Sequence, residues 1–251
     1  MAILIKTDRE IELMRISGKI LAEVLDACSK MAQIGVSTKE LDTFAEDLIR
    51  KNGAIPAFKG YHGFPATLCT AVNDRIVHGI PRADEILQDG DLLTIDCGVT
   101  YEGMITDAAR SIGIGKISDE KKRLIKTANE ALSKAIDLAK PGIHVGEIGA
   151  LIQEIIEKEG FHVVYDLTGH GVGRKLHEDP VIANYFDGNK GPTLKAGMTI
   201  AIEPIFSSGT SKMKTLKDGW TIVTIDGSTA VQAENTLLIT KDGCEVLTEL
   251  N

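Results

Sequence analysis

The sequence predicts an α+β fold in which two similar halves each carry a pair of helices followed by β-rich segments. Apolar residues recur at helical spacing over residues 8–33, and comparable patterns cover residues 118–139 and 145–158. After each helix pair the chain contains short apolar, β-prone runs separated by glycine and proline, which is typical of strands. Helix pairs that alternate with β-rich sequence therefore indicate an α+β protein.

Capping residues and a repeated spacing support the two halves. Ser37 and Glu40 form a predicted capping box, and the helix that follows should end near Lys51. Gly53 and Gly160, which follow the second helix of each pair, lie 107 positions apart. Chance similarity of two amphipathic helix pairs is the alternative. If the repeat is real, the functional site should lie between the halves, where clefts tend to form. We expect one domain, residues 1–251, with an internal repeat of roughly residues 8–115 and 118–250.

Composition and charge exclude several classes of protein. The chain of 251 residues is 43% hydrophobic and 25% charged, which is ordinary for a globular protein. Its formal charge of −8 argues against nucleic acid as the primary ligand and against binding to an anionic membrane. The four cysteines are scattered without a CxxC pair, and neither a signal peptide nor a long apolar run is present. We expect a cytoplasmic enzyme or binding protein.

Two aspartates in a predicted β-hairpin are the first candidate metal ligands. Residues 91–112 form an apolar, β-prone run, a turn and a returning run. If the turn is centred between Tyr101 and Glu102, Asp96 and Asp107 face each other with Cβ atoms roughly 5 Å apart. Two carboxylates so close repel each other unless one is protonated or a cation lies between them. A surface hairpin with solvated aspartates is the alternative, and a three-residue loop would put the two on opposite faces.

Further metal-ligand residue types appear downstream. His170 lies in a glycine-rich segment, and Glu203 and Glu234 each lie in an otherwise apolar, strand-like run. A buried carboxylate there is costly unless it is paired or bound to a metal, although a solvated glutamate on an edge strand fits the same pattern. Together with Asp96 and Asp107 these residues form an oxygen and imidazole ligand set, which suits Mn, Fe, Co or Zn. Two such ions would activate a bridging water, which is hydrolytic chemistry.

Competing catalytic motifs fail on inspection. Val181 stands where the second histidine of a zinc-binding HExxH motif beginning at His177 would be. The glycine-rich residues 169–173 are soon followed by Pro180, so they do not open a helix that could bind phosphate. No GxSxG motif is present, and no cysteine lies in a convincing nucleophile setting.

These residues resemble a known family over nearly the whole chain. The five ligand candidates, with Gly169-His170-Gly171 and the run from His177 to Pro180, are similar to the methionine-aminopeptidase-like "pita-bread" metalloenzymes. Residues 60–65, 73–81 and 218–224 look like those of type I methionine aminopeptidases. The resemblance implies a pita-bread fold, with pseudo-symmetric αα-β halves around a curved antiparallel sheet and helices on its outer face.

The resemblance also implies an activity and roles for individual residues. The enzyme would remove the initiator methionine from nascent polypeptides when the second residue is small, with a metal-activated bridging water attacking the peptide carbonyl. The implied ligands of two divalent ions (Co, Mn, Fe or Zn) are Asp96, Asp107, His170, Glu203 and Glu234. The implied catalytic residues are Glu203 as proton shuttle, His78 near the scissile nitrogen and His177 near the carbonyl oxygen. The implied methionine pocket contains Tyr61, Phe64, Cys69 and Trp220, although core packing is the simpler explanation for each of these alone.

Two alternatives to a methionine-removing enzyme stay open, and a few positions depart from the family pattern. Leu176 precedes His177 where an aromatic residue is common, and Asn235 follows Glu234 where a histidine is frequent. Leu176 is expected to reshape the pocket, and Asn235 slightly weakens the case against a related enzyme that cleaves X-Pro bonds. A binding protein on the same fold is the third possibility, but such relatives lose ligands that are all present here. We expect a monomer, and any transient contact with the ribosome would use its folded surface.

Overall fold

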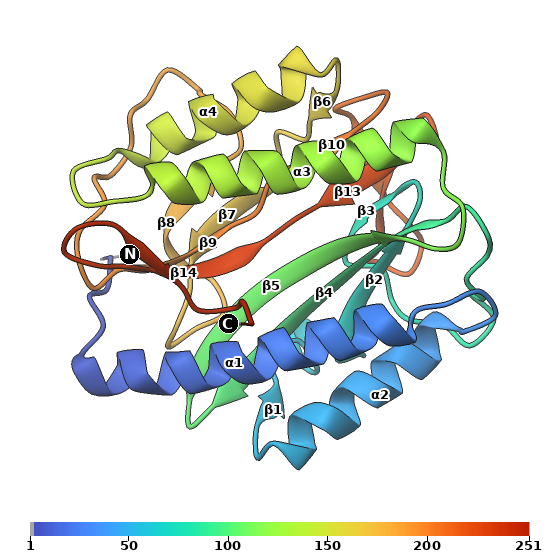
Figure 1. The fold of residues 1–251 in the computed structure, drawn as a ribbon, viewed down its shortest axis with the longest axis horizontal. Helices are drawn as coiled ribbons and strands as arrows, with labels where there is room; N and C mark the ends of the chain where they lie inside the picture. Colours follow the sequence, from blue (N-terminus) through green and yellow to red (C-terminus); the bar gives the residue numbers. More distant parts are fainter. Residues whose placement is uncertain (1–2, 251) are drawn as a thin grey trace.

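Four α-helices lie on one side of the strands in the computed structural model, which describes residues 3–250 (Figure 1). Residues 1, 2 and 251, which the expected domain includes, lie outside the described part. The helix boundaries agree with the sequence prediction to within two residues. Within residues 3–250, no helix is both long and apolar enough to cross a membrane. The helices are α1 (Asp8–Met31), α2 (Thr38–Lys51), α3 (Asp119–Leu138) and α4 (Val145–Lys158), with a short 3-10 helix η1 (Tyr61–Gly63).

The strands of the described residues pair in an antiparallel manner and confirm the predicted α+β class. The two larger sheets have the orders β1-β4-β2, with β5 also on β4, and β15-β14-β9-β7-β8. Two three-stranded sheets, β13-β10-β6 and β11-β12-β3, accompany them. The strands are β1 (Ile55–Pro56), β2 (Leu68–Val72), β3 (Arg75–Val77), β4 (Leu92–Tyr101), β5 (Met104–Gly113), β6 (His162–Val163), β7 (Thr168–Gly171), β8 (Glu178–Ala183), β9 (Thr199–Ile202), β10 (Ile205–Ser207), β11 (Met213–Thr215), β12 (Ile222–Thr224), β13 (Ala230–Gln232), β14 (Asn235–Ile239) and β15 (Cys244–Val246).

The offset of 107 positions relates features throughout the two halves. Helices α2 and α4 have the same length and start 107 residues apart. The predicted capping box of α2 forms, and at the start of α4 the Glu147 side chain likewise accepts from the backbone N–H of His144. Strands β1 and β6 are offset in the same way, and their pairings with β4 and β10 use equivalent positions. Asp96 and Glu203 have this spacing as well, so two candidate ligands occupy equivalent places in the two halves.

The hairpin of β4 and β5 forms, but its register differs from the prediction. Tyr101 pairs with Met104, so the turn has two residues and is centred one position later than expected. Asp96 therefore pairs with Ala109, and Asp107 pairs with Gly98. The predicted direct pairing of the two aspartates is wrong. Because Asp96 and Gly98 share a face of the strand, the two carboxylates still lie on one face as diagonal neighbours.

Each helix pair buries its apolar face against its own half of the sheets. Leu21 and Leu25 of α1 and Leu41 of α2 are fully buried in one cluster with Leu93 and Ile95 of β4. A second cluster joins α3 and α4 to β9 and β14. Burial of a leucine or isoleucine side chain contributes about 1.5–3 kcal/mol. The cores therefore hold the strands rigidly from behind, and the face opposite the helices remains for the site.

A buried ion pair ties the N-terminal segment to the first residue of β8. The Lys6 Nζ donates to Glu178 Oε2 at 2.6 Å, and both side chains are almost completely buried. Glu178 Oε1 accepts from the backbone N–H of Lys175, and the backbone N–H of Lys6 donates to the carbonyl of Gly197. Breaking one partner of such a pair leaves an uncompensated buried charge.

We expect Lys6→Met to lower the free energy of unfolding by about 3–5 kcal/mol, because Glu178 loses its buried cation. Adding Glu178→Gln should restore most of the loss, since no buried charge then remains. Urea denaturation measures both. Arg82→Ala, which removes the exposed pair with Asp84, is the control and should cost less than about 1 kcal/mol. A similarly small cost for Lys6→Met would contradict the argument.

Candidate metal centre and substrate pocket

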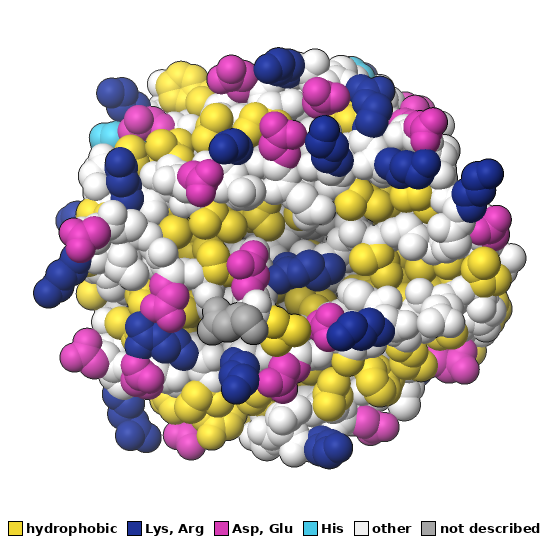
Figure 2. Space-filling view, in the orientation of Figure 1, with side chains coloured by type: hydrophobic (Ala, Val, Ile, Leu, Met, Phe, Trp, Pro, Cys, Tyr) yellow, Lys and Arg dark blue, Asp and Glu magenta, His cyan; other side chains and the backbone are white. Residues whose placement is uncertain are grey.

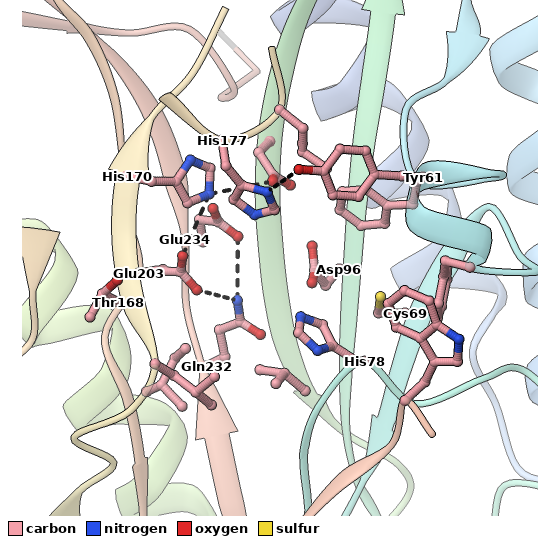
Figure 3. A pocket seen from close by; sticks show the side chains of 18 of the residues that line it. Tyr61, Cys69, His78, Asp96, Thr168, His170, His177, Glu203, Gln232 and Glu234 are labelled. Carbon is pink, nitrogen blue, oxygen red and sulfur yellow. Dashed lines mark hydrogen bonds and ion pairs between the residues drawn. The ribbon is translucent and has the colours of Figure 1, made fainter. Parts of the chain in front are cut away.

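All residues that the sequence predicted for the site line one cavity of about 310 Å³ (Figure 3). Residues from both halves of the chain contribute to its wall. Carboxylates, histidines, and aromatic and aliphatic side chains all contribute to its wall, and Asp96 and His78 lie on the same side of the view as Cys69 and Tyr61 (Figure 3). The predicted residues in its wall are Tyr61, Phe64, Cys69, His78, Asp96, Asp107, His170, His177, Glu203, Trp220 and Glu234.

Strands and breaks between strands position the carboxylates. Asp96 and Asp107 lie on β4 and β5, whereas Glu203 lies between β9 and β10 and Glu234 between β13 and β14. The long strands expected around the two glutamates are therefore interrupted. Pro204 has no N–H for a ladder, and it follows the glutamate at the first break. The backbone of Glu234 instead forms an isolated bridge with Ala109, which brings it beside the hairpin.

Burial and mutual repulsion disfavour the charged forms of these carboxylates. Burial raises the pKa of Asp96 to about 7. Burial, with the charges of Asp96 and Glu203, raises the pKa of Asp107 well above its usual value. Burial, with the charge of Asp107 foremost among its neighbours, does the same for the pKa of Glu234. The pKa of Glu203 is raised by burial and by Asp96. A bound cation would reverse these effects, because it favours the charged forms.

His170 presents a ligand nitrogen to the carboxylates. Its Nδ1 lies 2.8 Å from the carbonyl oxygen of Gly171, to which Nδ1–H donates. The neutral ring therefore has its lone pair on Nε2, which lies 3.9 Å from Asp107 Oδ2 and 3.7 Å from Glu203 Oε1. Burial lowers the pKa of His170 to about 4, which keeps the ring neutral. An imidazole held through its second nitrogen is the usual arrangement of a metal ligand.

The residues present fit divalent cations. Asp96 Oδ1, Asp107 Oδ1 and Glu234 Oε1 are buried without a hydrogen-bond partner in the structure. Buried oxygens of this kind call for a cation or a proton. Within residues 3–250, ligand atoms of Asp107, His170 and Glu234 lie within 4.8 Å of one another. Asp96 and Glu203 line the same cavity beside this group. The donor set of carboxylates and one imidazole suits Mn, Fe, Co or Zn.

His78 and His177 lie near each other at the cavity, on opposite halves of the chain. His78 directly follows β3 and has a positive φ of 57°, an uncommon conformation that is found often at functional sites. Burial, with His177 nearby, lowers the pKa of His78. Burial, with His62 nearby, lowers the pKa of His177. Both rings are therefore held in the neutral form, which can donate one hydrogen bond and accept another.

Comparison with known proteins agrees with this geometry. The model of the metallopeptidase family M24 matches residues 12–241. The chain belongs to this family. It is similar to the methionine aminopeptidase of Clostridium perfringens, with 47% identity over 98% of both chains, and to methionine aminopeptidase 1 of Bacillus subtilis, with 46% identity over 99% of this chain and 100% of the other.

Solved structures give the same family and confirm the pita-bread fold. The methionine aminopeptidase of Thermotoga maritima superposes with a TM-score of 0.97 at 41% identity, covering 99% of this chain and 100% of the other. The prolidase of Pyrococcus horikoshii superposes with a TM-score of 0.81 at 29% identity, covering 98% of this chain but 64% of the other. This M24 protein therefore matches the former over its full length and the latter over part of it.

An apolar slot adjoins the carboxylates in this M24 protein. Phe64 and Trp220 meet edge to face with ring centroids 5.2 Å apart. Phe64, Cys69 and Leu176 belong to one buried cluster, with Tyr61 and Trp220 packed against it. The expectation that Leu176 shapes the pocket agrees with its place in the wall. A slot of aromatic rings with the thiol of Cys69 suits a long thioether.

Sequence reasoning missed several residues that hold the carboxylates. Gln232 lines the cavity, and its Nε2 donates to Glu203 Oε2 at 3.2 Å and to Glu234 Oε2 at 3.3 Å. The Thr236 hydroxyl accepts from the backbone N–H of Asp107 and donates to its carbonyl oxygen. Gln232 and Thr236 each stand two residues from Glu234. Because residues two apart in a strand point to the same face, this spacing was the sequence signal that could have identified them.

Two further residues act from behind the cavity. Arg110 donates from Nη1 to the carbonyl of Glu234 at 2.6 Å and from Nη2 to Asn235 Oδ1 at 2.8 Å. The Nη2 also donates to the carbonyl of Thr248. Asn235 donates in turn to Glu249, and it is absent from the cavity wall. The departure from the family pattern at this position therefore lies outside the cavity wall.

The buried carboxylates predict how the metal-free protein responds to pH. Because the pKa of Asp96 rises from 3.8 to about 7 on folding, the folded state holds a proton that the unfolded chain releases over that interval. The stability that the Asp96 proton contributes should therefore be lost as the pH rises from about 4 to about 7. Calorimetry with a chelator should give a lower Tm at about pH 8 than at about pH 5, and Mn²⁺ should raise the Tm at the higher pH. Asp107→Asn should weaken both effects, whereas a Tm that does not respond to Mn²⁺ would contradict the proposed site.

Proposed function

We propose that the protein is a metal-dependent aminopeptidase that removes the initiator methionine from nascent polypeptides whose second residue is small. The observation that carries the proposal is the single cavity in which an apolar, sulfur-lined slot adjoins a carboxylate and histidine cluster. Full-length similarity to methionine aminopeptidases supports the same substrate. A monomeric state and a cytoplasmic location stay predictions, as does transient contact with the ribosome.

Asp96, Asp107, His170, Glu203 and Glu234 would hold the metal ions. Divalent cations in this site would supply a nucleophilic water of lowered pKa and would polarise the scissile carbonyl. The unpartnered oxygens and the lone pair on His170 Nε2 support this ligand set. Because several divalent ions accept such donors, the identity and the number of the ions are left to experiment.

The protein's own side chains would orient the peptide and move the proton. Tyr61, Phe64, Cys69 and Trp220 would bind the methionine side chain and exclude water from it. His78 would hydrogen-bond to the scissile nitrogen, and His177 to the carbonyl oxygen as the carbon becomes tetrahedral. Glu203 would take the proton of the attacking water and give it to the departing amine nitrogen. Hydrolysis then yields free methionine and a new amino terminus.

The first test is product analysis on two peptides, Met-Ala-Ser and Ala-Pro-Ala. With Mn²⁺ or Co²⁺ we expect free methionine from the first peptide and no release from the second, and a chelator should stop the reaction. Mass spectrometry identifies the products. Release of alanine alone would instead favour an aminopeptidase that cleaves X-Pro bonds. No release from either peptide, with metal bound, would favour a binding protein.

Glu203→Gln should lower kcat by about 10²–10⁴-fold, because the amide cannot carry the proton. The amide keeps the size of the side chain, so the fold should be retained. Glu159→Gln, a glutamate at the exposed end of α4, is the matched control and should retain full activity. A Glu203→Gln protein with normal kcat would overturn the role of this residue.

A further inference from the structure

A hydrogen bond links a residue of the proposed methionine slot to one of the two histidines. The Tyr61 hydroxyl lies 2.8 Å from His177 Nδ1 (Figure 3). The two rings are tilted by 50° with centroids 5.4 Å apart. His177 also meets His170 edge to face, with centroids 4.4 Å apart. The imidazole of His177 is therefore held on two sides, and one of its nitrogens is engaged by Tyr61.

The backbone around Tyr61 holds its ring in this position. Gly60, with a φ of 90°, directs the chain into η1, which carries Tyr61. The backbone N–H of Tyr61 donates to the carbonyl of Phe58, and its own carbonyl accepts from the N–H of Phe64. The ring of His62 packs edge to face against that of Tyr61, with centroids 4.4 Å apart. The hydroxyl thus reaches His177 from a short, well-fixed turn rather than from a free loop.

The chemistry of the two groups decides which one donates. A neutral imidazole carries one proton, on either Nδ1 or Nε2. A phenol is a better hydrogen-bond donor than a neutral imidazole N–H, and an imidazole nitrogen is a better acceptor than a phenol oxygen. Burial raises the pKa of Tyr61, so its hydroxyl keeps its proton. In the favoured arrangement Tyr61 donates to Nδ1, and the proton of the imidazole is on Nε2.

We propose that Tyr61 is a positioning residue that fixes the tautomer of His177, so that Nε2–H is free to donate to the carbonyl oxygen of the scissile peptide. This inference rests on the proposed function and gives Tyr61 a role beyond lining the methionine slot. In the opposite tautomer, Nε2 would present a lone pair to the carbonyl oxygen as negative charge develops there. Such an arrangement would repel rather than stabilise the tetrahedral species.

The kinetic test is Tyr61→Phe, which removes the hydroxyl and keeps the ring in the slot. With Mn²⁺ and Met-Ala-Ser we expect kcat to fall roughly tenfold while KM stays within about twofold, because the hydrogen bond acts in the transition state. A role in methionine binding alone would raise KM instead, and that result would overturn the proposal. Tyr185→Phe, which lies outside the cavity, is the matched control and should match the parent protein.

A double-variant cycle separates tautomer control from general damage. In a His177→Gln background the amide nitrogen can donate near the position of Nε2 whether or not Tyr61 is present. Tyr61→Phe should therefore cost little more in that background, so the two changes should be strongly non-additive. Additive losses would overturn the proposal. Cleavage of Met-Ala-Ser by the parent protein tests the proposed function separately, so the two failures are distinguishable.

Nitrogen-15 NMR of imidazole-labelled, zinc-loaded protein reads the tautomer directly, without activity. We expect the His177 resonances to report Nε2–H in the parent protein and a mixture of tautomers in Tyr61→Phe. His177→Gln assigns the signal among the six histidines of the chain. An Nδ1–H tautomer in the parent protein, or an unchanged tautomer in Tyr61→Phe, would overturn the inference.

Discussion

The structure depends on keeping four mutually repelling carboxylates and one imidazole together in a buried place. Asp96, Asp107 and Glu234 are almost fully buried, and several of their oxygens have no hydrogen-bond partner. Such a cluster is unfavourable without cations, because each charge loses its hydration and meets like charges. The free energy that holds it together must therefore come from the surrounding scaffold and from bound metal.

The scaffold fixes the carboxylates mainly through their backbones. The Thr236 hydroxyl accepts from the backbone N–H of Asp107 and donates to its carbonyl oxygen, and Arg110 donates to the carbonyl of Glu234. The bridge between Ala109 and Glu234 joins the two larger sheets at the same place. Because these bonds use main-chain groups, they leave the carboxylate oxygens available for ligands, and Gln232 is the residue that donates to the side chains of Glu203 and Glu234. The apolar cores under the two helix pairs keep these strands from moving apart.

The two halves carry related but different groups into the cavity. Asp96 and Glu203 occupy positions offset by 107 residues, yet Asp96 lies within a continuous strand and Glu203 lies at a break before Pro204. The longer glutamate at an interrupted strand accepts from Gln232 and lies close to His170. Asp96 and Glu203 thus occupy equivalent positions but have different surroundings. This difference is consistent with our proposal that Asp96 only binds metal whereas Glu203 also moves a proton. The surface over the helices carries basic and acidic side chains interspersed (Figure 2).

The sequence by itself determined the four helices, the α+β class, the family and the residue types of the site. These features depend on local signals, such as the capping box at Ser37 and the helical spacing of apolar residues, or on motifs that can be recognised in the sequence alone. The tertiary structure decided the register of the hairpin, the strand breaks at Glu203 and Glu234, and the supporting contacts of Arg110 and Thr236. Register follows from the length of one turn, and the contacts join residues more than 120 positions apart, so no local pattern encodes them. The bond between Tyr61 and His177 belongs to this second group, because only the folded chain brings its two ends within 2.8 Å.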